Sequence, residues 1–165
     1  IVVKNCQLGA QPTGITCKVQ EVNKLSFINN QVYPDGRENL VLDACDNCVI
    51  EGNNFKSYYN GILVLNGNDN TVNKNIFWLT GAVQNQLLDH GDDFGIINVK
   101  GNNNMVASNS LSCEWAYAGV NAVQGTGNVF KNCFVDNLES YRVFLVNAQT
   151  EVSNCVSSDK VSIVE

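Results

Sequence analysis

One short phrase recurs along the chain and always contains asparagine. Seven copies can be written: VVKNCQL, LSFINNQV, VIEGNNF, TVNKNIF, MVASNSL, VFKNCFV and VSNCVS. The asparagines that align are Asn5, Asn29, Asn53, Asn75, Asn109, Asn132 and Asn154, at intervals of 24, 24, 22, 34, 23 and 22 residues. A repeat of this length is typical of solenoids, in which each repeat packs only against its neighbours.

A second column runs in register with the asparagines. It consists of Gly14-Ile15, Gly61-Ile62, Gly95-Ile96 and Gly119-Val120, with Glu38-Asn39 in the second repeat. Short apolar stretches lie between the columns, so each period holds three strand-like runs, which fits one coil of a parallel β-helix. Coils about 4.8 Å apart would stack equivalent residues. Asparagine tolerates a left-handed corner, and stacked side-chain amides can hydrogen-bond along the stack. We therefore predict a single-stranded parallel β-helix of about seven coils, with 22–24 residues per coil.

A β-sandwich with asparagine-rich turns is the alternative fold. It would show irregular hairpin spacing and many Asn-Gly or Asp-Gly turns. Only Asp35-Gly36, Asn60-Gly61 and Asn66-Gly67 occur, and two of these follow the repeat. Leucine-rich repeats would need a leucine pattern that is absent. The periodicity therefore favours the β-helix.

Composition and charge exclude several classes of protein. Hydrophobic residues make up 44% and charged residues 16%, which is incompatible with a disordered chain. Apolar runs reach only four or five residues, too short for a transmembrane helix. A net charge of −6 and scattered basic residues argue against nucleic-acid binding, and nothing supports membrane attachment. The opening IVVKNCQLG suggests a mature chain or a fragment, so we expect one β-helix domain, 1–165, with flanking domains missing.

The chain has seven cysteines, so at least one thiol lacks an intrachain partner. Cys45 and Cys48 form a lone CxxC without a second pair or a nearby histidine, which argues against zinc. Cys133 and Cys155 occupy equivalent places on adjacent coils, where a disulfide or a stack of buried thiols would fit. We favour buried thiols that act as small hydrophobic side chains.

Another stack is predicted to be hydrophobic. Phe55 and Phe77 occupy equivalent places, and Leu111 and Phe134 continue their column. We expect this column to lie in the core rather than to bind a ligand.

The repeat is broken once, in the fourth coil. The asparagine and glycine columns are eight to ten residues apart in the other coils, but twenty separate Asn75 from Gly95. We predict an insertion of about ten to twelve residues within 79–92, whose returning part is DHGDDFG. Function on solenoids usually resides where loops depart from the repeat.

Loops of neighbouring coils would lie beside this insertion and gather aromatic, acidic and basic residues on one face. These are Tyr33, Asp35, Arg37, Glu38, Lys56, Tyr58, Tyr59, Glu114, Trp115, Tyr117, Glu139, Tyr141 and Arg142. Aromatic rings stack on sugar rings, and carboxylates accept hydroxyl hydrogen bonds, so a face that extends over several coils suits a poly- or oligosaccharide. We predict substrate binding by His90, Tyr58, Tyr59, Trp115, Tyr117 and Arg142. The alternative is a polar face whose aromatic residues pack under loops.

Asp92, Asp93 and Glu114 are the predicted catalytic residues. Glycosidic hydrolysis needs two carboxyl groups, roughly 5 Å apart for retention and about 6.5 to 9.5 Å apart for inversion. Asp92 and Asp93 would point to opposite faces of a regular strand. Both can therefore reach one substrate only at a bend, and otherwise Asp93 would act with Glu114. His90 could orient or protonate the substrate.

A lyase would need a strong base, for which Arg37, Lys56 and Arg142 are the candidates, and Ca²⁺ to neutralise a uronate. The acid-rich character favours hydrolysis, and we predict no cofactor and no metal.

The phrase NNMVASN and the Gly-Ile column resemble the right-handed parallel β-helix superfamily of pectate lyases, polygalacturonases and phage tailspikes. Gly91-Asp92-Asp93 is similar to the G-D-D motif of polygalacturonases, and Arg142 to the arginine of their Arg-Ile-Lys motif. The remaining acid, histidine and lysine of that family fall at about Asn60, Ala118 and Phe144, so the motif is incomplete. The tailspike resemblance implies a homotrimer and an extracellular or virion location.

Three functional hypotheses follow from the sequence. The first is a polysaccharide hydrolase that uses Asp92, Asp93 and Glu114. The second is a non-catalytic glycan-binding or receptor-binding module that uses the same face. The third is a structural β-helical stalk, in which the aromatic residues point inward or into subunit contacts.

Overall fold

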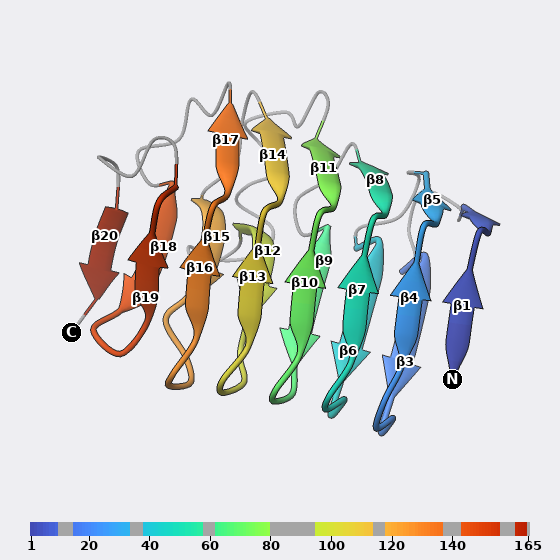
Figure 1. Cartoon of the computed structure of the whole chain (residues 1–165), viewed down its shortest axis with the longest axis horizontal. Coiled ribbons are helices and arrows are strands. Elements are labelled where there is room, and N and C mark those ends of the chain that lie inside the picture. The colour runs from blue at the N-terminus through green and yellow to red at the C-terminus, as the bar shows by residue number, and fades with distance from the viewer. Residues whose placement is uncertain are drawn as a thin grey trace.

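Strands at the same position of successive coils pair in parallel and form three sheets (Figure 1). The computed structural model describes residues 1–9, 15–33, 38–57, 62–79, 95–113, 118–136, 143–155 and 161–164. All regular secondary structure in these residues is β-strand, and the two termini lie at opposite ends of the stack. The predicted all-β parallel β-helix is confirmed.

The strands of each sheet are given in the order in which they pair along the stack. Sheet A contains β1 (Val2–Lys4), β4 (Ser26–Ile28), β7 (Val49–Glu51), β10 (Thr71–Asn73), β13 (Met105–Ala107), β16 (Val129–Lys131) and β19 (Glu151–Ser153). Sheet B contains β2 (Gln7–Leu8), β5 (Gln31–Val32), β8 (Asn54–Ser57), β11 (Ile76–Leu79), β14 (Ser110–Cys113) and β17 (Phe134–Asp136). Sheet C contains β3 (Cys17–Gln20), β6 (Leu40–Asp43), β9 (Leu63–Asn66), β12 (Gly95–Val99), β15 (Ala118–Ala122), β18 (Phe144–Asn147) and β20 (Val161–Val164).

Two adjacent columns of residues form the corner between sheets A and B. The first column turns the chain with positive φ angles of 51° to 67°, and its members are Asn5, Asn29, Gly52, Lys74, Ser108, Asn132 and Asn154. The second column, one residue later, comprises Cys6, Asn30, Asn53, Asn75, Asn109, Cys133 and Cys155. The sequence-based alignment mixed the two columns, because asparagine is frequent in both.

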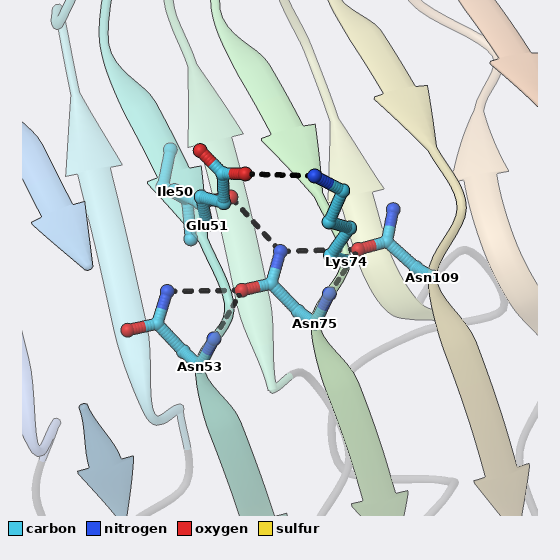
Figure 2. A network of polar contacts seen from close by, with 6 residues as sticks. All are labelled: Ile50, Glu51, Asn53, Lys74, Asn75 and Asn109. Carbon is cyan, nitrogen blue, oxygen red and sulfur yellow. Dashed lines mark hydrogen bonds and ion pairs between the residues drawn. The ribbon is translucent and has the colours of Figure 1, made fainter. Parts of the chain in front are cut away.

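The buried asparagines of the second column form a continuous amide ladder (Figure 2). Asn75 Oδ1 accepts hydrogen bonds from the backbone N–H and from Nδ2 of Asn53, both at 2.9 Å. Asn75 Nδ2 donates to the carbonyl of Ile50 at 2.9 Å and to Oδ1 of Asn109 at 3.0 Å. One side chain thus satisfies polar groups on the coils before and after it, which is required of polar groups buried from water.

Cysteines continue this ladder in the last coils. The Cys133 backbone N–H donates to Cys155 Sγ at 3.4 Å, and Cys133 Sγ donates to the Val106 carbonyl at 3.7 Å. These contacts repeat the pattern of the asparagines. The six cysteines whose side chains the structure describes are free thiols, which confirms buried thiols over a disulfide at Cys133 and Cys155. The hydrogen bond between them raises the pKa of Cys133 and lowers the pKa of Cys155 to about 7.

The core contains the predicted phenylalanine stack. The rings of Phe55 and Phe77 are 5.0 Å apart and nearly parallel, and Leu111 is buried in the same column. The expectation for Phe134 was wrong, because this side chain points outward and is 47% exposed. Val135 takes the core position, since it pairs with Leu111. The error follows from placing Asn132 rather than Cys133 in the ladder.

The connections between sheets B and C vary in length. The fourth coil has fifteen residues, 80–94, between its sheet B and sheet C strands, and the other coils have four to eight. The longest of these connections thus falls in the fourth coil, where the insertion was predicted, and the bounds of the insertion stay a prediction. Leu79, the first residue of the predicted range, is a buried residue of β11.

Candidate functional site

The residues predicted to act on a substrate all fall in connections between sheets B and C. Tyr58 and Tyr59 follow β8; His90, Asp92 and Asp93 precede β12; Glu114, Trp115 and Tyr117 link β14 to β15; and Arg142 precedes β18. All nine lie outside the described residues. The separation of their carboxyl groups therefore stays a prediction.

The strands on either side of these connections fix where each connection begins and ends. Leu79 at the end of β11 pairs with Ser57 on one side and with Cys113 on the other. At the other end of these connections, where sheet C begins, Gly95 of β12 pairs with Ala118 of β15. Paired residues of adjacent strands are about 5 Å apart. The connections that contain the predicted residues therefore leave and rejoin the β-helix side by side.

The outer surface of sheet B adjoins the start of these connections, and we call it the sheet B face. Its described side chains are Gln7, Gln31, Tyr33, Asn54, Lys56, Ile76, Trp78, Ser110, Ser112 and Phe134. The intervening side chains, such as Phe55 and Phe77, point into the core. The three exposed aromatic side chains of the described chain, Tyr33, Trp78 and Phe134, all lie on this face, at 39%, 47% and 47% exposure.

Side chains of this face contact one another both between coils and within one coil. The ammonium group of Lys56 on β8 lies 4.5 Å from the centre of the Trp78 ring on β11, which is a cation–π distance. Tyr33 Oη donates to Gln31 Oε1 at 2.6 Å. These contacts hold the exposed rings without burying them.

Trp78 was missed by the sequence reasoning, although a signal for it exists. In Ile76–Leu79 the side chains alternate, and Phe77 and Leu79 are buried. A strand that begins after the ladder residue Asn75 must therefore turn Ile76 and Trp78 outward. Lys56 and Tyr33 were both expected near the site, and the structure places them on the sheet B face.

The structure also bears on metal binding and on membranes. No group of three or more histidine, cysteine, aspartate or glutamate side chains within the described ranges is arranged to hold a metal ion. In the same part of the chain, no helix has the length and apolar character needed to cross a membrane.

The sequence matches the family model described as "Right handed beta helix region" over residues 13–163. The chain therefore belongs to the right-handed β-helix family, as its repeat indicated. No curated protein matches the sequence.

Among solved structures, the chain is similar to a DFA-IIIase from Arthrobacter chlorophenolicus A6 in complex with GF2. The TM-score is 0.79 and the sequence identity is 19%, over 99% of this chain and 45% of the DFA-IIIase chain. The chain thus spans less than half the length of that protein. At this identity the likeness shows a shared fold.

Proposed function

We propose that this chain is a carbohydrate-active β-helix domain that hydrolyses a poly- or oligosaccharide. The observation that carries the proposal is the position of the exposed aromatic side chains. Trp78 lies next to the last residue of β11, after which the chain enters the connection that contains Asp92 and Asp93. Sugar rings stack on aromatic side chains, and glycosidic hydrolysis needs a pair of carboxyl groups. The DFA-IIIase with the similar fold binds GF2, an oligosaccharide, which supports a carbohydrate ligand.

In the proposed mechanism, Asp93 acts with Asp92 or with Glu114. One carboxyl group donates a proton to the leaving oxygen, and the other activates water or attacks the sugar directly. Two carboxylates held close together raise the pKa of one of them, and that group becomes the acid. His90 orients the substrate, and Tyr58, Tyr59, Trp115, Tyr117 and Arg142 bind it.

The test is release of reducing ends from a panel of polysaccharides. Asp93→Asn should lower the rate at least about 100-fold, because it removes an acid–base or nucleophilic group. Asp69→Asn is the matched control, since Asp69 is an exposed aspartate at the opposite, sheet C to sheet A, corner. We expect its rate to stay within twofold of the parent chain. Equal rates for the parent and Asp93→Asn would overturn the assignment of Asp93.

A non-catalytic glycan-binding or receptor-binding module is the second candidate. The cation–π pair of Lys56 and Trp78 favours it, because this pair gives an exposed binding surface that needs no catalytic group. Binding of a glycan without release of reducing ends, in the parent chain and in both variants, would favour this candidate.

The tailspike resemblance adds the proposal of a homotrimer that is extracellular or on a virion. Light scattering should then give three times the 18.0 kDa mass of the chain.

A further inference from the structure

The sheet B face carries less charge than the outer surface of sheet A. Lys56 is the only charged residue among its described side chains, and the others are amides, hydroxyls, aromatic rings or aliphatic groups. Asp136, which pairs with Ser112, adds one acidic position at the end of β17. On sheet A, the positions Lys4, Glu51, Lys131 and Glu151 interrupt the outer surface with charge. A surface rich in hydroxyl and amide groups with a balanced charge suits an uncharged, hydroxyl-rich ligand.

Trp78 offers a contact surface on one side only. Lys56 covers the indole from the β8 side, so the open side faces β14. There the chain presents Ser112, a small and partly exposed side chain, beside Trp78. A sugar ring can therefore lie against the indole and direct its hydroxyl groups to the serine.

Phe134 lies across β14 from β11, but it is offset from Trp78 along the strands. It pairs with Ser110, which pairs with Ile76, whereas the position across β14 from Trp78 is Asp136. The stacking surface is therefore the Trp78 indole, with Ser112 beside it.

The charge of the whole chain opposes an anionic ligand. The net charge is −6, and the one described cation of the sheet B face is already engaged with Trp78. A polyanion would meet long-range repulsion and would find no row of basic side chains on this face.

We infer that the sheet B face binds a neutral glycan, with Trp78 as the stacking surface, and that the domain selects neutral glycans over uronate-bearing ones. The inference rests on the proposed function for the choice of a carbohydrate ligand, but it does not depend on hydrolysis. A second copy of the chain is the competing occupant of the face.

The test is binding, measured by affinity electrophoresis and calorimetry. The panel contains neutral β-glucan, galactomannan and fructan, together with polygalacturonate and alginate, at about 50 and 500 mM NaCl. We expect binding to at least one neutral glycan, with a dissociation constant that changes less than about twofold with salt, because charge screening leaves it unaffected. Trp78→Ala should weaken this binding about tenfold, and Trp78→Phe should weaken it less.

Val2→Ala is the control variant, because it removes an exposed apolar side chain from sheet A, and it should bind as the parent chain does. Circular dichroism should show all variants folded, because each altered side chain is at least partly exposed.

Three outcomes would overturn the inference. These are salt-sensitive binding to polygalacturonate or alginate only, binding by Trp78→Ala equal to the parent chain, and absence of binding together with a dimer that Trp78→Ala dissociates. The Asp93→Asn chain separates this inference from the proposed mechanism. If it binds and still releases sugar, the catalytic assignment fails and the neutral-glycan inference stands.

Discussion

Two corners of the same solenoid differ in how much the length of the connecting segment varies from coil to coil. Between sheets A and B, each coil for which both strands are described turns with two residues, the first with positive φ and the second in the ladder column. Between sheets B and C, the connection ranges from four residues to fifteen. The ladder corner has no freedom in length, because an amide such as Asn75 must meet both neighbouring coils at once.

The comparison separates what the fold requires from what it permits. A ladder residue fixes the register of the strands on both sides of it, so a change there is transmitted to neighbouring coils. The other corner needs only to return the chain to the start of sheet C. Residues for binding and catalysis can therefore vary there at low cost to stability.

Inserting residues tests this difference most directly. A Gly-Ser insertion between Gly52 and Asn53 should lower the free energy of unfolding by more than about 4 kcal/mol, because it displaces a buried amide and leaves its partners unpaired. The same insertion between Tyr59 and Asn60 should cost less than about 1 kcal/mol. Urea unfolding followed by circular dichroism measures both. Equal losses of unfolding free energy would show that the two corners tolerate an insertion equally well.

Removing one ladder amide is a smaller perturbation. Asn75→Ala should lower the free energy of unfolding by about 3 kcal/mol or more, because the Asn53 and Ile50 groups that it satisfies stay buried. Asn73→Ala is the matched control on the outer surface of sheet A, and it should cost within about 0.5 kcal/mol. Urea unfolding of the two variants provides the measurement. A loss for Asn75→Ala no larger than that for Asn73→Ala would mean that the ladder is not what restricts this corner.

The same contrast explains how much the sequence could predict. Parallel stacking requires equivalent residues one coil apart, so the fold and its period were visible in the asparagine phrases. The choice between Asn132 and Cys133 as the ladder residue was not visible, because a thiol replaces the amide there while an asparagine takes the left-handed turn. Because of that one-residue error, Phe134 was predicted to lie in the core.

The functional residues obey no such repetition. The aromatic and charged residues indicated that the functional site lies in the connections between sheets B and C. No periodic constraint, however, places Asp92, Asp93 and Glu114 relative to one another. Trp78 illustrates the opposite case. It lies on a regular strand, so its outward direction followed from alternation once the ladder position Asn75 was fixed.

A stack of polar side chains on the outer surface of sheet C should have the smallest effect on stability. Because it is exposed, it tests how far the contribution of the ladder depends on burial. On the outer surface of sheet C, Asp43 accepts hydrogen bonds from Gln20 Nε2 and Asn66 Nδ2, both at 2.8 Å, and Lys18 Nζ lies 3.5 Å away. These side chains come from successive coils, as in the ladder, but they are open to water. The hydrogen bonds from Gln20 and Asn66 lower the pKa of Asp43, with a smaller contribution from Lys18.

Because the folded-state pKa of Asp43 is lowered, its contribution to stability is present above the ordinary carboxyl pKa and is lost as the pH falls below it. We therefore expect the parent chain to exceed Asp43→Asn slightly in urea midpoint at pH 7, and the difference to vanish as the pH falls through the lowered folded-state pKa of Asp43. Asn66→Ala should reduce the difference by removing one donor. The effect should be far smaller than that of Asn75→Ala, since water competes for every partner of Asp43. A difference between the parent chain and Asp43→Asn that does not depend on pH would show that the stack leaves the pKa of Asp43 unaffected. The larger contribution of the ladder to stability would then come from burial alone.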